Sequence, residues 1–247
     1  KESGLFGYNR NKTRSGLFYD ALRIIKHIKP KIAIAENVKN LTSKRFRADF
    51  DEILQSLDEA GYSNYWQVLN AKDYNIPQNR ERVLIVSVRK DVDTGIFKFP
   101  EPLPLELKLK DLLEDDVEEK YYLNDKKIKM FSDMTNRNGF IRGKRFNPFE
   151  LDDDRVAHTI TTRPTSRPEG NFIKSNSGLK IRGLTPKECF RLMGFDDKDV
   201  DILVKHGVSD AQLFKMAGNS IVVTMLGYLF KNLMPILKKE KKNEENN

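Results

Sequence analysis

Cysteine is nearly absent from the sequence: Cys189 is the only one among 247 residues. A single cysteine cannot form an internal disulfide, so we expect a reducing, cytoplasmic setting. Only three histidines accompany it, and the two residue types never recur at metal-ligand spacing, so no metal site is predicted. The residues around Cys189 form an apolar stripe of a predicted helix, which indicates a core side chain and not a nucleophile.

Long apolar runs and a targeting segment are also lacking. The longest apolar run, residues 221–230, is interrupted by Thr224 and Gly227. Because a membrane span needs about 20 apolar residues, we expect no membrane partner. No signal peptide opens the chain, which starts at Lys1 in what reads as a loop, so we expect a piece of something longer.

The composition is that of a soluble globular protein, with 38% hydrophobic and 32% charged residues. The net charge is +8 and is unevenly spread: residues 1–99 carry +6, residues 100–135 carry −4 and residues 136–182 carry +5. This distribution, with an acidic region between two basic ones, is what we expect if only part of the surface contacts a polyanion. An ordinary solvated surface of positive bias is the alternative.

Helical and strand patterns alternate between residues 14 and 90, which favours an α/β fold. The predicted elements are a helix over 17–28, a strand over 31–35, a helix over 46–57, and strands over 65–69 and 83–88. Prolines at 100, 102 and 104 then mark a domain boundary. Residues 105–180 show only short possible strands, and helices follow two predicted capping boxes, at 185–188 and 209–212.

Glu36 and Asn37 lie at the carboxyl end of the predicted strand over 31–35, which we take to be parallel to its neighbours. Ligands bind at that edge of open α/β sheets, and a carboxyl group there can share a proton with a base ring nitrogen. A carboxylate that caps the next helix or pairs with a lysine is the alternative.

Gln78, Arg80 and Arg82 occupy alternate positions at the entry to a predicted strand, which places them on one face. Two guanidinium groups on one face suit phosphate or a base carbonyl oxygen. A surface ladder of ion pairs with Glu81 and Asp73 is the other interpretation.

Residues 218–220 (Gly-Asn-Ser) precede a predicted helix, where free N–H groups can bind a carboxylate or phosphate. An ordinary helix cap is the alternative. The glycine-rich N-terminal residues include Arg10 and Lys12. They form either a frayed end or a basic loop that closes over nucleic acid.

Taken together and in order, several segments resemble blocks of the C5-cytosine-specific DNA methyltransferases. The segments are residues 14–20, 35–41, 76–83, 182–189 with 192–195, and 217–222. Residues 158–161 are similar to the Thr-aliphatic pair near the end of the family's target-recognition region. The resemblance covers nearly the whole chain and is loosest between 91 and 155; five short blocks in order carry more weight than any one of them.

The resemblance implies part of a Rossmann-like methyltransferase sheet with a smaller, irregular and mostly-β target-recognition domain. It divides the chain into a catalytic domain at 1–100, a target-recognition domain at 101–211 and a returning helix at 212–247. The implied activity is transfer of a methyl group from S-adenosylmethionine to C5 of a flipped-out cytosine in double-stranded DNA, of restriction-modification or phage type and without a metal.

Roles for particular residues follow from the same resemblance. Glu36 would hold N3 of the cytosine and Asn37 would orient its loop. Arg82 would contact the base oxygen, and Arg80, grouped with Gln78, would support the pocket or a phosphate.

Cofactor and DNA contacts are implied as well. Leu17 would line the adenine site of the cofactor, and Asn219 and Ser220 would contact its methionine end. The implied DNA contacts are Arg10, Lys12, Thr159, Arg163 and Arg167.

The family's Pro-Cys nucleophile block and Gly-rich cofactor loop are missing from these residues. We therefore expect a missing N-terminal portion or a complementary subunit, in the cytoplasm of a bacterial or phage-infected cell. A related RNA methyltransferase and a non-catalytic DNA-specificity subunit are the alternatives.

Overall fold

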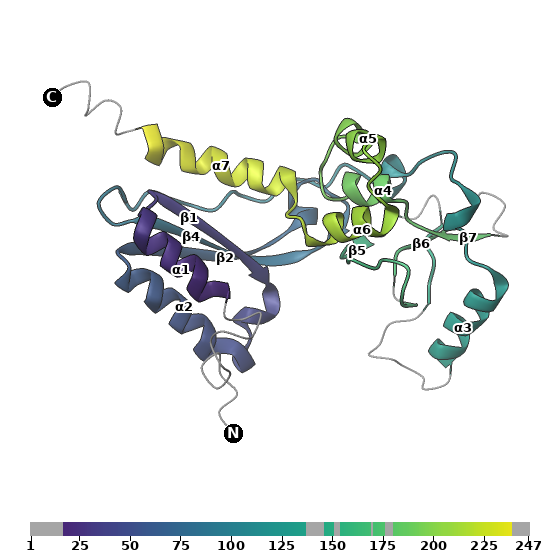
Figure 1. Cartoon of the computed structure of the whole chain (residues 1–247), viewed down its shortest axis with the longest axis horizontal. Coiled ribbons are helices and arrows are strands. Elements are labelled where there is room, and N and C mark those ends of the chain that lie inside the picture. The colour runs from purple at the N-terminus through teal and green to yellow at the C-terminus, as the bar shows by residue number, and fades with distance from the viewer. Residues whose placement is uncertain (1–16, 137–145, 151–153, 169, 176–179, 239–247) are drawn as a thin grey trace. The chain divides into compact units, whose positions relative to one another are not determined.

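The computed structural model describes residues 17–136, 146–150, 154–168, 170–175 and 180–238. The chain forms two compact units, whose described elements are labelled in Figure 1. Unit 1 holds the chain up to Asn70, Glu81–Glu101 and the residues from Tyr228 onward. Unit 2 holds Ala71–Arg80 and Pro102–Gly227. The division into functional domains at 100 and 211 remains a proposal.

Unit 1 is a three-stranded sheet with helices. Its elements are α1 (Leu17–Ile28), β1 (Ile32–Val38), α2 (Arg47–Glu59), β2 (Tyr62–Asn70), β4 (Glu81–Arg89) and the second half of α7 (Val223–Lys238). Short 3-10 helices, Lys39–Thr42 and Lys44–Phe46, connect β1 to α2. The predicted helices and strands of this region are therefore confirmed.

The strand directions differ from the prediction. The order is β1-β4-β2, and β4 is antiparallel to both neighbours. The expectation that the strand carrying Glu36 is parallel to its neighbour was wrong. β1 and β2 run in the same direction, but β4 returns between them, and Glu36 lies within β1, opposite Leu84.

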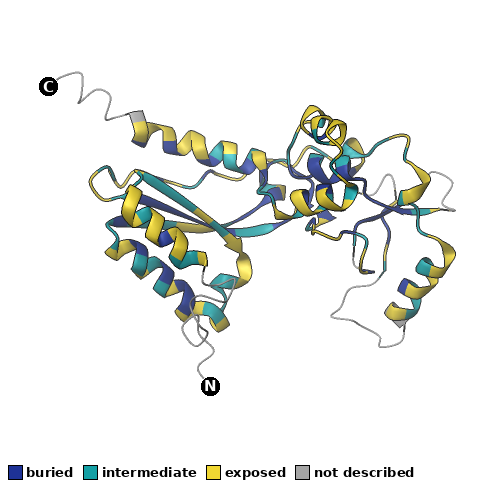
Figure 2. Ribbon diagram, viewed as in Figure 1, coloured by how far each residue is buried: buried dark blue, intermediate teal, exposed yellow. Residues whose placement is uncertain are grey.

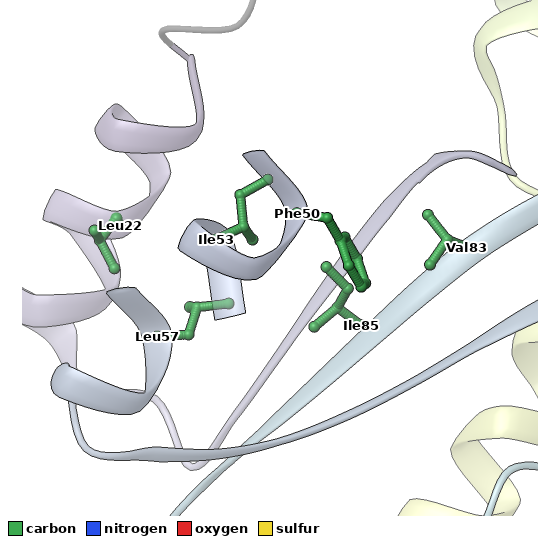
Figure 3. Close-up of a cluster of buried hydrophobic side chains, with 6 residues drawn as sticks. All are labelled: Leu22, Phe50, Ile53, Leu57, Val83 and Ile85. Carbon is green, nitrogen blue, oxygen red and sulfur yellow. The ribbon is translucent and has the colours of Figure 1, made fainter. Parts of the chain in front are cut away.

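Burial follows the place of each strand in the sheet. Residues 83–88 of β4 are all buried, as suits a central strand covered on both faces. On one face Leu22 of α1 and Phe50, Ile53 and Leu57 of α2 pack in a cluster that includes Val83 and Ile85 of β4 (Figure 3). Figure 1 draws the second half of α7 on the opposite side of the sheet.

β1 contrasts with β4 because none of its seven residues is buried. Figure 2 shows this strand in the intermediate and exposed colours. Its only strand partner among the described residues is β4. One edge of an apolar strand is therefore left without a neighbour within the part of the chain that the structure describes.

Unit 2 has short strands and several helices. Its helices are α3 (Asp125–Asn136), α4 (Pro186–Arg191), α5 (Asp197–Lys205), α6 (Asp210–Asn219) and the start of α7, with 3-10 turns at Ala71–Tyr74, Leu109–Leu112 and Glu119–Tyr121. β3 (Gln78–Asn79) pairs in parallel with β5 (Ala157–His158), and β6 (Phe172–Lys174) is antiparallel to β7 (Ile181–Gly183). The unit is irregular, but it is more helical than the mostly-β expectation.

A buried ion pair joins β7 to α4 in unit 2. Arg182 donates from both terminal nitrogens to the two carboxylate oxygens of Glu188, each at 2.8 Å. The same carboxylate accepts the backbone N–H groups of Thr185 and Glu114, at 2.8 and 2.9 Å. The Thr185–Glu188 capping box is confirmed, whereas no side-chain cap bond forms at Ser209.

One stretch, Asp210–Leu237, is long and apolar enough to cross a membrane by length and composition alone. The expectation from the sequence was that no such stretch exists, because only uninterrupted apolar runs were considered there. The structure divides it into α6 and α7. Buried positions such as Leu213 and Leu229 give these helices core-facing stripes. Only 28% of the apolar window is buried, so α6 and α7 each pack one stripe against the protein and leave the other face exposed.

Candidate functional site

Glu36 and Arg82 meet at one end of the sheet in unit 1. Arg82 Nε lies 2.7 Å from Glu36 Oε1. Val38 of β1 is the direct partner of Arg82, and Glu36 lies two residues before it, so both side chains are on the same face. The side chains are 14% and 23% exposed, so the pair is sheltered but within reach of a ligand.

Neighbouring polar groups fix the same strand end. Asn37 Oδ1 accepts the backbone N–H of Val38 at 2.8 Å, which fixes the last two residues of β1. Lys39 Nζ pairs with Glu81 Oε1 at 2.7 Å, and both side chains are largely exposed. The expected ladder partner of the arginines, Glu81, is thus bound by a lysine that the sequence reasoning had not singled out.

Arg80 has a different environment, in unit 2. Its side chain is buried, and its terminal nitrogens donate to the backbone oxygens of Ile160, Gly218 and Ser220 at 3.0, 3.1 and 2.8 Å. Gln78 is also buried: its Nε2 donates to Leu192 O at 2.7 Å. These two side chains bind the protein's own backbone.

The expectation that Gln78, Arg80 and Arg82 share one face was wrong. β3 ends at Asn79 and β4 begins at Glu81, so the regular alternation of a single strand does not apply across Arg80. Arg82 pairs with Glu36, whereas Gln78 and Arg80 both bind backbone atoms of Ile160. The two guanidinium groups therefore bind different partners, a carboxylate for Arg82 and backbone oxygens for Arg80, and do not form one shared site for phosphate or a base oxygen.

The helix-terminus argument for residues 218–220 was also wrong. Asn219 is the last residue of α6 and Ser220 its C-cap, and α7 starts only at Val223. Ser220 Oγ donates to Ala217 O at 2.9 Å. The end of α6 presents carbonyl groups, two of which Arg80 binds, so it has no surplus of N–H donors. Asn219 itself is exposed.

A polar cavity of about 570 Å³ lies in unit 2. Three predicted DNA contacts, Thr159, Arg163 and Arg167, line it. The remaining lining residues are Asn79, His158, Thr161, Thr162, Pro164, Ser166, Gly170 and Asn171. Arginine and hydroxyl side chains around one hollow suit phosphate oxygens. Arg10 and Lys12 lie outside the described residues.

Asn171 is a positioning residue that the sequence reasoning missed. It is buried, accepts the backbone N–H of His158 at 2.7 Å and donates to the backbone oxygen of His158 at 2.9 Å. It thereby fixes the strand that leads into the cavity. An asparagine directly before the apolar residues Phe172 and Ile173 was the only local signal for it.

Cys189 is fully buried, as the sequence indicated. Burial, and secondarily the charge of Glu188, raise the pKa of its thiol. A thiol in this state is a poor nucleophile. Among the described residues, no group of three or more His, Cys, Asp or Glu side chains is arranged to hold a metal; independence from metals remains a prediction.

These features define an α/β protein with an acid–guanidinium pair on its sheet and a basic, hydroxyl-lined cavity in a second unit. A family model described as C-5 cytosine-specific DNA methylase matches residues 7–234. The chain belongs to this family.

Similar curated proteins include two Type II methyltransferases. M2.ScrFI of Lactococcus lactis subsp. cremoris is 38% identical over 228 residues, which cover 90% of this chain and 59% of that protein. M.HhaI of Haemophilus parahaemolyticus is 34% identical over 233 residues, covering 90% and 68%. The chain thus spans less than two thirds of the first of these relatives.

Solved structures support the fold. The methyltransferase EhMeth of Entamoeba histolytica aligns with a TM-score of 0.70 at 20% identity, covering 91% of this chain and 69% of that one. The S. pombe Dnmt2 methyltransferase aligns with a TM-score of 0.69 at 22% identity, covering 93% and 74%. The predicted α/β methyltransferase fold is confirmed.

Proposed function

We propose that the complete protein is a DNA (cytosine-5-)-methyltransferase of restriction-modification or phage type, and that this chain supplies its base-holding part. "Complete protein" here means this chain together with a portion outside the sequence given. The observation that carries the proposal is the Glu36–Arg82 pair, with 2.7 Å between Oε1 and Nε. Family membership and the Type II methyltransferase relatives support it.

The pair offers complementary groups for one pyrimidine edge. A carboxyl group can hydrogen-bond at N3 of cytosine, and a guanidinium can donate to the neighbouring base oxygen. C5 and C6 cannot be reached while the base is stacked, so the target is flipped out of the duplex. When a thiolate adds to C6, electron density moves toward N3, and Glu36 stabilises the adduct by protonation there.

The nucleophile comes from the portion outside the sequence given. Cys189, the single cysteine of this chain, is fully buried and far from a thiolate state. The edge of β1 that has no strand neighbour among the described residues offers a place where a further strand can add. We propose that the missing N-terminal portion or a complementary subunit provides the Pro-Cys block and the Gly-rich cofactor loop.

S-adenosylmethionine is the methyl donor of this proposal. In unit 1, Leu17 at the start of α1 is 65% exposed, and in unit 2, Asn219 at the end of α6 is exposed, so each residue by itself is open to a ligand. Leu17 would contact the adenine, while Asn219 and Ser220 would contact the methionine end. No metal enters the proposal.

Double-stranded DNA would meet the unit 2 cavity. Thr159, Arg163 and Arg167 would bind phosphate or base edges there, with Arg10 and Lys12 as further contacts. The cytoplasm of a bacterial or phage-infected cell is the proposed location.

Replacing Arg163 with alanine in the complete protein should weaken DNA binding and lower the salt slope of log K by about 1, because one phosphate contact is lost. Titrations of labelled duplex at several salt concentrations measure this. Lys198→Ala removes an exposed lysine outside the cavity and serves as the control. Equal slopes and an unchanged sequence preference for Arg163→Ala would remove it from the DNA contacts.

Bisulfite sequencing of host DNA tests the function itself. Cells that express the complete protein should carry cytosines resistant to conversion within one short recurring sequence. Cells that express only the 247-residue chain should show none, because the nucleophile is absent. Resistance confined to RNA would favour an RNA methyltransferase. Tight DNA binding without methylation by the complete protein would favour a specificity subunit.

A further inference from the structure

We propose that Arg80 is a positioning residue that couples the 217–222 turn to the 159–163 loop of the unit 2 cavity. The proposal rests on the proposed function, in which that turn contacts the cofactor and that loop contacts DNA. Arg80 itself touches neither ligand in this scheme. When the cofactor makes the 217–222 turn more rigid, the bonds of Arg80 make the 159–163 loop more rigid as well.

One guanidinium connects the two segments. Arg80 donates to Ile160 O at 3.0 Å on the loop side, and to Gly218 O at 3.1 Å and Ser220 O at 2.8 Å on the turn side. The residue is only 3% exposed. A buried carbonyl oxygen that loses a charged donor is left without an adequate partner, which costs free energy. The three bonds of Arg80 therefore keep the two segments joined.

The two backbones also touch directly. A Cβ placed on Gly218 would lie 2.4 Å from the backbone N of Thr162 and 2.5 Å from the backbone C of Thr161. Only glycine allows this approach. A shift of the turn must therefore displace the loop, and Arg80 prevents the two from separating.

The residues before Arg80 fix the loop as well. Gln78 Oε1 accepts the backbone N–H of Ile160 at 2.8 Å, and the Thr159 hydroxyl donates to Asn79 O at 2.7 Å. Both backbone polar groups of Ile160 are thus bound by the 78–80 segment. The side chains next to Ile160 line the cavity, so their positions depend on this segment.

Replacing Arg80 with lysine separates the effect of its positive charge from the effect of its three hydrogen bonds. It keeps the positive charge but offers a single ammonium group, which cannot reproduce the planar fork that reaches three separated oxygens. A ligand that rigidifies one segment can also rigidify a second segment that is packed against it and hydrogen-bonded to it. By linkage, DNA on the loop would in turn favour the cofactor on the turn.

Hydrogen–deuterium exchange of the complete protein tests the coupling without turnover. The probe is S-adenosylhomocysteine, the demethylated product of the donor. In the wild type it should slow exchange at residues 217–222, and also at residues 159–163, by roughly fivefold or more. In Arg80→Lys the slowing at 217–222 should remain, whereas the slowing at 159–163 should be lost.

Arg191→Lys is the matched control, because Arg191 binds Leu112 O and Asp197 in the same unit and touches neither segment. It should behave like the wild type. Slowing confined to 217–222 in the wild type, or retained at 159–163 in Arg80→Lys, would overturn the coupling while leaving the proposed function intact. No slowing at 217–222 would overturn both. If Arg80→Lys does not fold, slowing confined to 217–222 in the wild type still overturns the coupling, and Arg80→Gln, which keeps a planar amide donor but removes the charge, takes its place in the comparison.

Discussion

Replacing Glu36 with glutamine in the complete protein is expected to slow methyl transfer by about 10²–10⁴-fold. Glutamine keeps the size of the side chain and can hydrogen-bond to the base, but it cannot deliver a proton to N3. The affinity for DNA should stay within about threefold, since most of that affinity comes from contacts to the phosphate backbone. Single-turnover rates with a labelled methyl donor, together with binding titrations, separate the two effects.

The chain offers a close control for this experiment. Glu81 lies on the neighbouring strand end and also pairs with a cation, Lys39, but its side chain is 41% exposed, against 23% for Glu36. Glu81→Gln should leave the rate of methyl transfer nearly unchanged. Equal rates for Glu36→Gln and the wild type would remove Glu36 from the mechanism.

Replacing Glu188 with glutamine should lower the free energy of unfolding by about 3–5 kcal/mol. The carboxylate is fully buried and Arg182 is 6% exposed, so the variant leaves a guanidinium in the interior without its counter-charge. It also disturbs the acceptor of two backbone N–H groups, those of Thr185 and Glu114. Urea denaturation followed by circular dichroism gives the change.

Two further variants test the reason for that loss. Glu119 pairs with Lys180 at 2.9 Å, but both side chains are largely exposed, so Glu119→Gln should change the stability by less than about 1 kcal/mol. The double variant Arg182→Met, Glu188→Leu should be more stable than Glu188→Gln, since it leaves no buried charge. A Glu188→Gln protein as stable as the wild type would show that burial of the pair does not matter.

The spacing of apolar residues was enough to predict where the helices and strands of unit 1 lie. Apolar spacing located α1 and α2, and Gly61, at a φ of +94°, closes α2 as expected. The strand directions were predicted wrongly because an apolar run looks the same in sequence whether the neighbouring strand is parallel or antiparallel. The segment 71–80 belongs to unit 2, and the chain returns from it as β4 between β1 and β2.

Sequence reasoning placed Glu36 and Arg82 better than it placed Gln78 and Arg80. Glu36 and Arg82 were expected to meet and do so. Arg80 was expected beside them, yet its partners lie 80, 138 and 140 residues further along the chain. Residues 218–220 were expected to precede a helix, but α6 runs through Asn219, and the backbone of Gly218 lies against the 161–162 segment.

The sequence by itself determined the class of fold, the family, the helices and strands of unit 1, and the burial of Cys189, because periodicity and short motifs are local properties of the chain. Only the tertiary structure decided the direction of the strands, the partners of Arg80 and Gln78, and the cavity that gathers Thr159, Arg163 and Arg167. Those features depend on contacts between segments far apart in sequence, and a buried guanidinium or amide must bind whichever backbone oxygens the packing brings to it.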